Sequence, residues 1–146
     1  MVRSRGSPNQ VGSMPMTDPI ADLLTRIRNG QMAGIKQIRA PYSKIKFAVS
    51  KILEKEDYLD KVDLVESANP KFKELELTLK YKGKVPVIRK LKRVSTPGHR
   101  MYAKATELPR VYSDIGIAII STPNGLMTNK EARKRKLGGE VICEIF

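Results

Sequence analysis

The chain has 146 residues, enough for one ordinary domain or for two small domains that share an interface. Its 28 basic and 15 acidic side chains give a formal charge of +13, which is typical of a protein that binds a polyanion, although a merely basic soluble surface is the plainer interpretation. No apolar run approaches the roughly 20 residues that cross a bilayer, and the single cysteine, Cys143, excludes an internal disulfide bond.

Residues 1–15 are predicted to form a disordered basic extension, because Gly, Ser, Pro and Asn leave almost nothing to bury. A start codon assigned too far upstream is an alternative, since Met14 and Met16 lie close behind. The segment lacks the apolar centre of a secretory signal.

A first helix is predicted to begin at Asp18 and Pro19, because Asp is a favoured N-cap and Pro fits the first helical position. Gly30 is the predicted end of this helix. The apolar residues between them recur with helical spacing and define one buried face: Ile20, Leu23, Leu24 and Ile27.

Residues 37–42 predict a short strand that ends at Pro41, and Ser43 is the expected cap of a second helix. Lys44 and Lys46 lie in its first turn, where a cation interacts unfavourably with the helix dipole. This placement is easier to explain if the positive end of the helix faces an anion. Ser43 and Lys44 are therefore candidate phosphate contacts. The predicted buried stripe of this helix consists of Ile45, Ala48, Val49, Ile52 and Leu53.

Residues 62–66 and 74–81 predict an antiparallel hairpin, since Leu75, Leu77, Leu79 and Tyr81 alternate with polar residues. Its charges are mixed, which does not favour a nucleic-acid surface. Residues 16–82 thus predict an N-terminal domain built as a helix–strand–helix–hairpin unit.

Residues 85–94 predict a strand with four cations, which indicates an edge strand or a face that meets phosphate. A turn at residues 95–98 leads to a returning strand, residues 100–104. There Tyr102 lies between Arg100 and Lys104, a pattern suited to stacking on a base or ribose, although a half-buried tyrosine in a small sheet fits equally well. Residues 107–114 predict a connection with one helical turn.

Residues 116–120 predict a buried strand, and residues 123–125 have turn chemistry. Thr128 and Glu131 have the spacing of a capping box, and residues 129–137 predict a basic helix that Gly138 and Gly139 end with a left-handed stop. Residues 140–146 predict a last strand. Residues 83–146 therefore predict a second domain, an antiparallel sheet with one capped basic helix, and the whole chain an α+β fold of two small α/β domains.

The sequence lacks the groups that catalysis or metal binding needs. His99 is the only histidine and Cys143 the only cysteine, and no glycine-rich phosphate-binding motif is present. His99 is expected in a solvated turn, and Cys143 as a small buried residue in the last strand. We predict a protein without enzymatic activity, cofactor or metal.

Several motifs, in order and correctly spaced, resemble the small-subunit ribosomal protein eight family (S-eight), bacterial type. The resemblance covers nearly everything from residue 16 to residue 146. It is strongest in residues 121–133 (STPNGLMTNKEAR) and 137–140, and it reappears in residues 17–22, 24–29, 43–44 and 95–102.

The resemblance implies a two-domain α+β protein that binds the central domain of small-subunit ribosomal RNA, mainly through its C-terminal domain, and that helps the subunit assemble. It also implies neighbouring small-subunit ribosomal proteins as partners. Carried over by position, the implied RNA-binding residues are Ser121, Thr122, Asn124, Gly125, Thr128, Gly139 and Glu140, supported by Tyr102 and Arg100 and more weakly by Ser43 and Lys44.

Three positions need separate comment. Asn124 stands where the family often has Lys, which reduces a phosphate contact to a neutral hydrogen bond, and Thr96 stands where a basic residue is common. Glu140 would repel phosphate, but its carboxylate can accept hydrogen bonds from a base amino group and so confer selectivity. The alternative is a structural ion pair with Lys130 or Arg133.

Other functions stay open at this point. The family's members can also bind their own messenger RNA, so a free-standing RNA-binding translational regulator is the main alternative. An enzyme that cleaves phosphodiesters would lack metal ligands and a histidine base, and a membrane-surface protein would lack a suitable amphipathic helix. The expected location is the cytoplasm, in a bacterial-type small ribosomal subunit, and an organellar ribosome is a further option.

Overall fold

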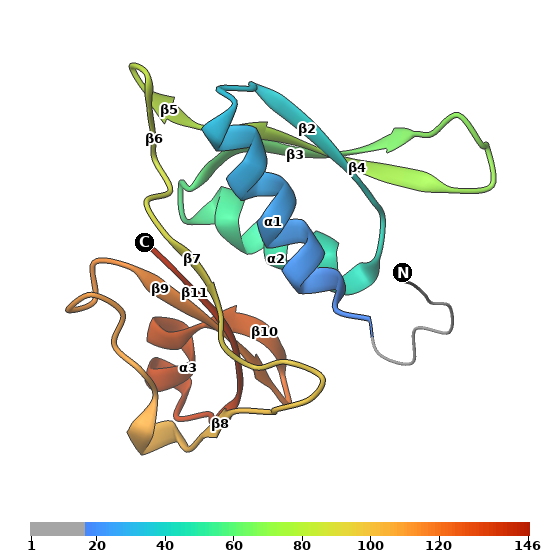
Figure 1. The fold of residues 1–146 in the computed structure, drawn as a ribbon. Helices are drawn as coiled ribbons and strands as arrows, with labels where there is room; N and C mark the ends of the chain where they lie inside the picture. Colours follow the sequence, from blue (N-terminus) through green and yellow to red (C-terminus); the bar gives the residue numbers. More distant parts are fainter. Residues whose placement is uncertain (1–16) are drawn as a thin grey trace, which may run out of the picture.

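A computed structural model describes residues 17–146 (Figure 1), so the predicted extension at residues 1–15 lies outside the described residues. Within that range the helices are α1 (Pro19–Met32), α2 (Lys44–Lys55) and α3 (Asn129–Arg135), with a 3₁₀ turn, η1 (Ala105–Glu107). The strands are β2 (Gln37–Pro41), β3 (Leu59–Glu66), β4 (Lys73–Leu79), β5 (Tyr81–Lys82), β6 (Val85–Pro86), β7 (Leu91–Arg93), β8 (Tyr102–Ala103), β9 (Ile117–Thr122), β10 (Gly125–Thr128) and β11 (Gly139–Ile145).

The strands pair into antiparallel sheets, and each sheet is built from one half of the chain. The first half forms a sheet in the order β2-β4-β3 and a small β5-β6 pair, and the second half forms a sheet in the order β10-β9-β11-β7, with β8 also pairing β11. In Figure 1, α1 and α2 lie against the first sheet and α3 against the second. The predicted α+β fold is confirmed.

The start of α1 follows the prediction, but its end does not. Asp18 caps the helix by accepting a hydrogen bond from the Ala21 amide at 3.1 Å. Gly30 does not end the helix, which continues to Met32. Gly30 is buried inside it, where an added Cβ would lie 2.8 Å from Ile38, and Gly34 supplies the left-handed residue (φ +69°) after the helix. Gly30 thus allows α1 to pack closely against Ile38 of β2 and Leu79 of β4.

Ser43 caps α2 as predicted, accepting from the Lys46 amide at 3.2 Å. The predicted buried stripe is only partly right, because Ile45 is 37% exposed, whereas Lys46 is 6% exposed and Ser50 is fully buried. The helix is therefore rotated so that Lys46 faces the protein. Burial lowers the pKa of the Lys46 ammonium, and Asp22 partly opposes that shift.

The first hairpin is confirmed as β3 and β4. Strand β3 begins earlier than predicted, at Leu59, and β4 covers residues 73–79 instead of 74–81. Leu75, Leu77 and Leu79 are buried, as their alternation indicates. Tyr81 is not part of this strand. It lies in β5, and its hydroxyl donates to the Ile35 carbonyl at 2.6 Å.

The start of the second half is less regular than predicted. Residues 85–94 contain only the short strands β6 and β7, and β7 lies at a sheet edge, as its cations suggest. Residues 102–103 do not return along β7 but pair with β11 as strand β8. The predicted helical turn occurs earlier, as η1, and not within residues 107–114.

Thr128 caps α3 by accepting from the Glu131 amide at 3.1 Å, whereas the Glu131 carboxylate binds Arg135 instead of closing a capping box. The helix ends at Arg135, and the left-handed residue after it is Lys136 (φ 59°), not Gly138 or Gly139. Residues 125–128, expected to be only a turn and a cap, form strand β10 against β9.

A partly buried ion pair connects the two halves. Arg93 of β7 binds Asp18 with Nε–Oδ2 and Nη2–Oδ1 distances of 3.0 and 3.1 Å, and its Nη1 donates to the Ile142 carbonyl at 2.6 Å. One apolar cluster also contains residues of both halves, including Leu24 and Ile119. The proposed domain boundary near residue 82 remains a prediction.

The dual role of Asp18 predicts unequal losses in two N-cap variants. Ser43→Ala removes only a cap and is expected to lower the free energy of unfolding by about 1 kcal/mol. Asp18→Ala removes a cap and also leaves Arg93 without its carboxylate, so the expected loss is about 3 kcal/mol. Urea unfolding monitored by circular dichroism measures both, and equal losses would show that Arg93 and Asp18 do not stabilise the fold.

Candidate nucleic-acid interface

Three of the predicted RNA-binding residues lie in one row across the second sheet. Tyr102 in β8 is opposite Glu140 in β11, Glu140 is opposite Ser121 in β9, and Ser121 is opposite Leu126 in β10. Directly opposed residues of antiparallel strands share a face. We call these four residues the cross-strand row. Tyr102 is 71% exposed, so it presents most of its ring to solvent.

Glu140 is held by two donors on one carboxylate oxygen. The fully buried Ser95 hydroxyl donates to Oε2, and Arg100 Nη1 donates to the same atom at 3.0 Å. Ser95 is itself fixed, because its hydroxyl accepts from the Met101 amide at 3.2 Å. The other oxygen, Oε1, receives no hydrogen bond from the described residues and is left for an incoming donor.

The alternative of an ion pair between Glu140 and Lys130 or Arg133 is therefore wrong. Its partner is Arg100, and Arg133 lies 3.6 Å from Asp114 instead. Arg100 reaches Glu140 because β8 pairs directly with β11, a contact that local sequence patterns do not predict.

The turn beside the row is shaped by Thr122. The Thr122 hydroxyl donates to the Gly125 carbonyl at 2.8 Å and accepts from the Asn124 amide at 3.1 Å. Thr122 is only 8% exposed, whereas Asn124 is exposed at the tip and Gly125 has a φ of 109°. Thr122 thus shapes the turn, and Asn124 and Gly125 are the residues that face solvent.

Two glycines allow the strands of the row to approach closely. A Cβ added at Gly139 would lie 2.0 Å from the Ser121 carbonyl oxygen, and one added at Gly138 would lie 2.6 Å from the Ala103 carbonyl oxygen. Both clashes involve backbone, which cannot move aside easily. Gly139 therefore allows β11 to pack closely against Ser121 of the row, whether or not its own backbone also contacts a ligand.

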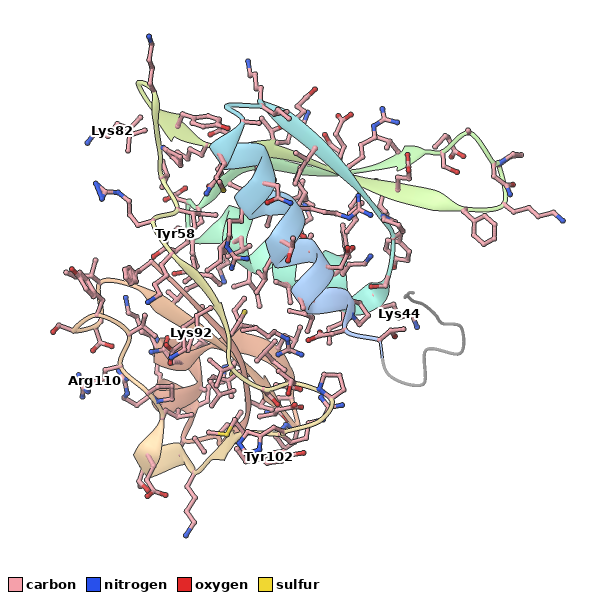
Figure 2. All side chains as sticks on the ribbon, viewed as in Figure 1. Lys44, Tyr58, Lys82, Lys92, Tyr102 and Arg110 are labelled. Carbon is pink, nitrogen blue, oxygen red and sulfur yellow. The ribbon has the colours of Figure 1, made fainter. Side chains whose placement is uncertain are left out.

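Of the remaining predicted residues, Thr128 lines a cleft together with Leu126 of the row, whereas Ser43 and Lys44 lie elsewhere. Thr128 is half-buried and occupied by its capping bond, on the wall of a cleft of about 240 Å³ that Lys55 of α2 also lines. Ser43 and Lys44 belong to the N-terminal half, where Figure 2 shows Lys44 at the start of α2. No hydrogen bond within residues 17–146 joins Ser43 or Lys44 to the row.

Sequence reasoning missed Ser95, Asn129 and β10. The buried Asn129 accepts from the Ala118 amide at 3.0 Å and donates to the Pro109 carbonyl at 2.8 Å, which fastens α3 to β9. A signal for β10 existed, since Asn-Gly between apolar runs is the strongest short-range indication of a hairpin. Ser95 and Asn129 had no local signal.

The described residues offer nothing that suggests catalysis. His99 is exposed in a turn. Cys143 is fully buried, and burial raises the pKa of its thiol to about 12, so it is a poor nucleophile. Within residues 17–146, no cluster of His, Cys, Asp or Glu could hold a metal ion, and no helix is long and apolar enough to cross a membrane.

Comparisons with known proteins match nearly the whole described chain. A family model described as Ribosomal protein S8 matches residues 18–146. The small ribosomal subunit protein uS8 of Rhodospirillum centenum (strain ATCC 51521 / SW) is 47% identical over 133 residues, which cover 91% of this chain and all of that relative.

The packing at Gly139 predicts a clear contrast between two glycine variants. Gly139→Ala should lower the free energy of unfolding by about 2–3 kcal/mol, because the new methyl group would push β11 away from the Ser121 carbonyl. Gly98→Ala is the control, since nothing lies within 4 Å of its added Cβ, and its effect should stay within about 0.5 kcal/mol. An unchanged urea midpoint for Gly139→Ala would contradict the close approach of β9 and β11.

Proposed function

The chain belongs to the ribosomal protein S8 family, and from this premise we propose that it binds the central domain of small-subunit ribosomal RNA directly and helps the subunit assemble. The family assignment itself makes it a ribosomal protein of the small subunit and not an enzyme. The direct contact with RNA is the proposal. It rests on one observation, the polar members of the cross-strand row, Tyr102, Glu140 and Ser121.

The chemistry of the row suits an RNA minor groove. That groove is wide and shallow in A-form RNA and presents 2′-hydroxyls and base edges. Ser121 offers a hydroxyl, Glu140 an acceptor at Oε1, and Tyr102 an exposed ring on which a base or ribose can stack. Adjacent strands are about 4.8 Å apart, so the three groups span about 10 Å, a width that neighbouring nucleotides can cover.

A carboxylate beside a polyanion requires compensation, and Arg100 supplies it. The guanidinium binds Glu140 Oε2 at 3.0 Å while the Arg100 side chain remains 48% exposed. Arg100 offers a cation to phosphate, and Glu140 offers an acceptor to the amino group of a base. Glu140 therefore contributes selectivity between RNAs, and the net charge of +13 contributes attraction for any of them.

The remaining expected contacts are part of the same proposal. Asn124 and Gly125 approach the RNA backbone at the tip of the hairpin, and Ser43 and Lys44 meet a phosphate at the start of α2. We place the protein in the cytoplasm, among neighbouring proteins of the small subunit. The messenger RNA that encodes this protein would bind to the same row if that RNA presents the same groove geometry. Co-sedimentation with small subunits at low and high salt separates a subunit component from a free-standing regulator.

The row predicts a loss of affinity that depends on the RNA sequence. Ser121→Ala should weaken binding to a central-domain fragment of the rRNA by about 3–10-fold and Glu140→Gln by about 10–100-fold, the usual ranges for one neutral and one charged hydrogen bond. Binding to a scrambled RNA of equal length should not change. Filter binding or fluorescence anisotropy at fixed salt measures both constants.

The control for that experiment is the double variant Lys134→Gln and Lys136→Gln on and after α3. These side chains are exposed and should act through charge alone, so their loss should weaken binding to both RNAs by a similar factor. The proposed surface is wrong if Ser121→Ala and Glu140→Gln, both folded, bind the cognate fragment as tightly as the unchanged protein.

A further inference from the structure

The segment between the two halves carries cations that the cross-strand row does not use. Residues 80–93 contain seven Lys or Arg side chains and no Asp or Glu. Two of them are paired, since Lys80 lies 4.0 Å from Asp57 and Arg93 binds Asp18. We call residues 82–92 the cationic strap. Its five cations are exposed and make no ion pair or side-chain hydrogen bond with the rest of residues 17–146: Lys82, Lys84, Arg89, Lys90 and Lys92.

The backbone of the strap is fixed although its cations face solvent. Ile88 and Leu91 are 2% and 6% exposed and belong to the main apolar cluster. Arg28 Nη2 donates to the Leu91 carbonyl at 2.7 Å, and the Arg89 amide donates to the Phe146 carbonyl at 2.6 Å. A partner therefore meets cations on a backbone that is already ordered, which lowers the entropic cost of binding.

The strap lies away from the cross-strand row. Lys92 is opposite Glu144 in β11, whereas Tyr102 is opposite Glu140, four residues earlier in the same strand. Four residues of extended strand span about 13 Å. The strap continues from Lys92 towards β5 and Lys82, away from the second sheet, as Figures 1 and 2 show. One short stretch of RNA on the row would not cover it.

The acidic groups near the strap are too few to neutralise it. Glu144 lines a cleft of about 280 Å³ together with Lys90, Lys92 and Arg110, and Arg110 is paired with Asp114 at 2.7 Å. The exposed Tyr112 ring stacks on Phe146 in the same cleft, with centroids 4.3 Å apart. A second unpaired carboxylate, Asp60, shares another cleft with Lys84 of the strap. Five unpaired cations against two unpaired carboxylates still leave a positive surface.

We propose that the cationic strap binds the phosphate backbone of a second segment of ribosomal RNA, separate from the segment on the cross-strand row. This inference rests on the proposed function. The strap is made of lysine, arginine and buried anchors, and it lacks the hydroxyl, amide and exposed aromatic groups that distinguish bases. Its contact is therefore independent of sequence and positions the protein on the folded RNA.

The test compares two RNAs over a series of salt concentrations. The strap variant is Lys84→Gln, Arg89→Gln and Lys92→Gln. The control, Lys61→Gln, Lys71→Gln and Lys73→Gln, removes three exposed lysines of the β3–β4 hairpin, of which only Lys61 has an ion-pair partner, Asp63 at 3.5 Å. With full-length small-subunit rRNA, the strap variant should make the slope of log affinity against log salt less steep by about 2. The reason is that three lost cations neutralise about three fewer phosphates, so fewer counterions are released on binding. With the short central-domain fragment, its slope should equal that of the unchanged protein.

Each other outcome decides against the proposal. An equal loss of slope on the short fragment means that strap and row meet the same RNA segment. A slope equal to the control's on full-length rRNA means that the strap does not bind RNA. If RNA binding is normal but the strap variant fails to enter subunits assembled with the full set of proteins, the partner is an acidic protein. Ser121→Ala, measured in parallel, tests the proposed function separately, since it should lower affinity for both RNAs without changing the slope.

Discussion

The ion pair between Arg93 and Asp18 fixes the geometry on which the rest of the molecule depends. Asp18 caps α1 with the same carboxylate that receives Arg93, and Arg93 also donates to the Ile142 carbonyl of β11. One side chain thus joins the first helix, the edge strand β7 and the central strand β11. Because β11 also contains Glu140, the position of the cross-strand row relative to the N-terminal half depends on this contact. The pair is mostly buried, with 13% and 19% of the two side chains exposed, so solvent screens it little.

The distribution of charge separates two kinds of contact along the surface. The row contains one acid, one hydroxyl and one phenol ring, whereas the cationic strap contains five unpaired cations with no acid among them. Groups of the first kind distinguish one RNA from another, and groups of the second kind bind any phosphate backbone. The strap lies about 13 Å or more along β11 from the row, so under the two proposals one surface would position the protein on folded RNA while the other selects the RNA.

Local patterns predicted what depends on neighbours in the sequence. The caps Asp18, Ser43 and Thr128 and the alternating leucines of β4 were all confirmed, because each follows from backbone groups a few residues away. Gly30, Gly138 and Gly139 were misinterpreted as helix ends, since a glycine needed for close packing looks the same in sequence as one needed for positive φ. The residue types of the candidate site came from the family resemblance. Their arrangement in a row did not, because it depends on the register of four strands from distant parts of the chain.

The environment of Glu140 explains how a carboxylate could serve the surface that we propose binds RNA. An isolated carboxylate would repel phosphate and would rotate freely among its rotamers. Ser95, fully buried and held by the Met101 amide, fixes Oε2, while Arg100 supplies the opposite charge at 3.0 Å. Oε1 is then held in a defined position, and it is the one charged hydrogen-bond acceptor of the row without a partner among the described residues. Under the proposed function, an RNA that offers an amino group there would gain a charged hydrogen bond, and one that offers an oxygen would not, so the same residue would favour one RNA over another.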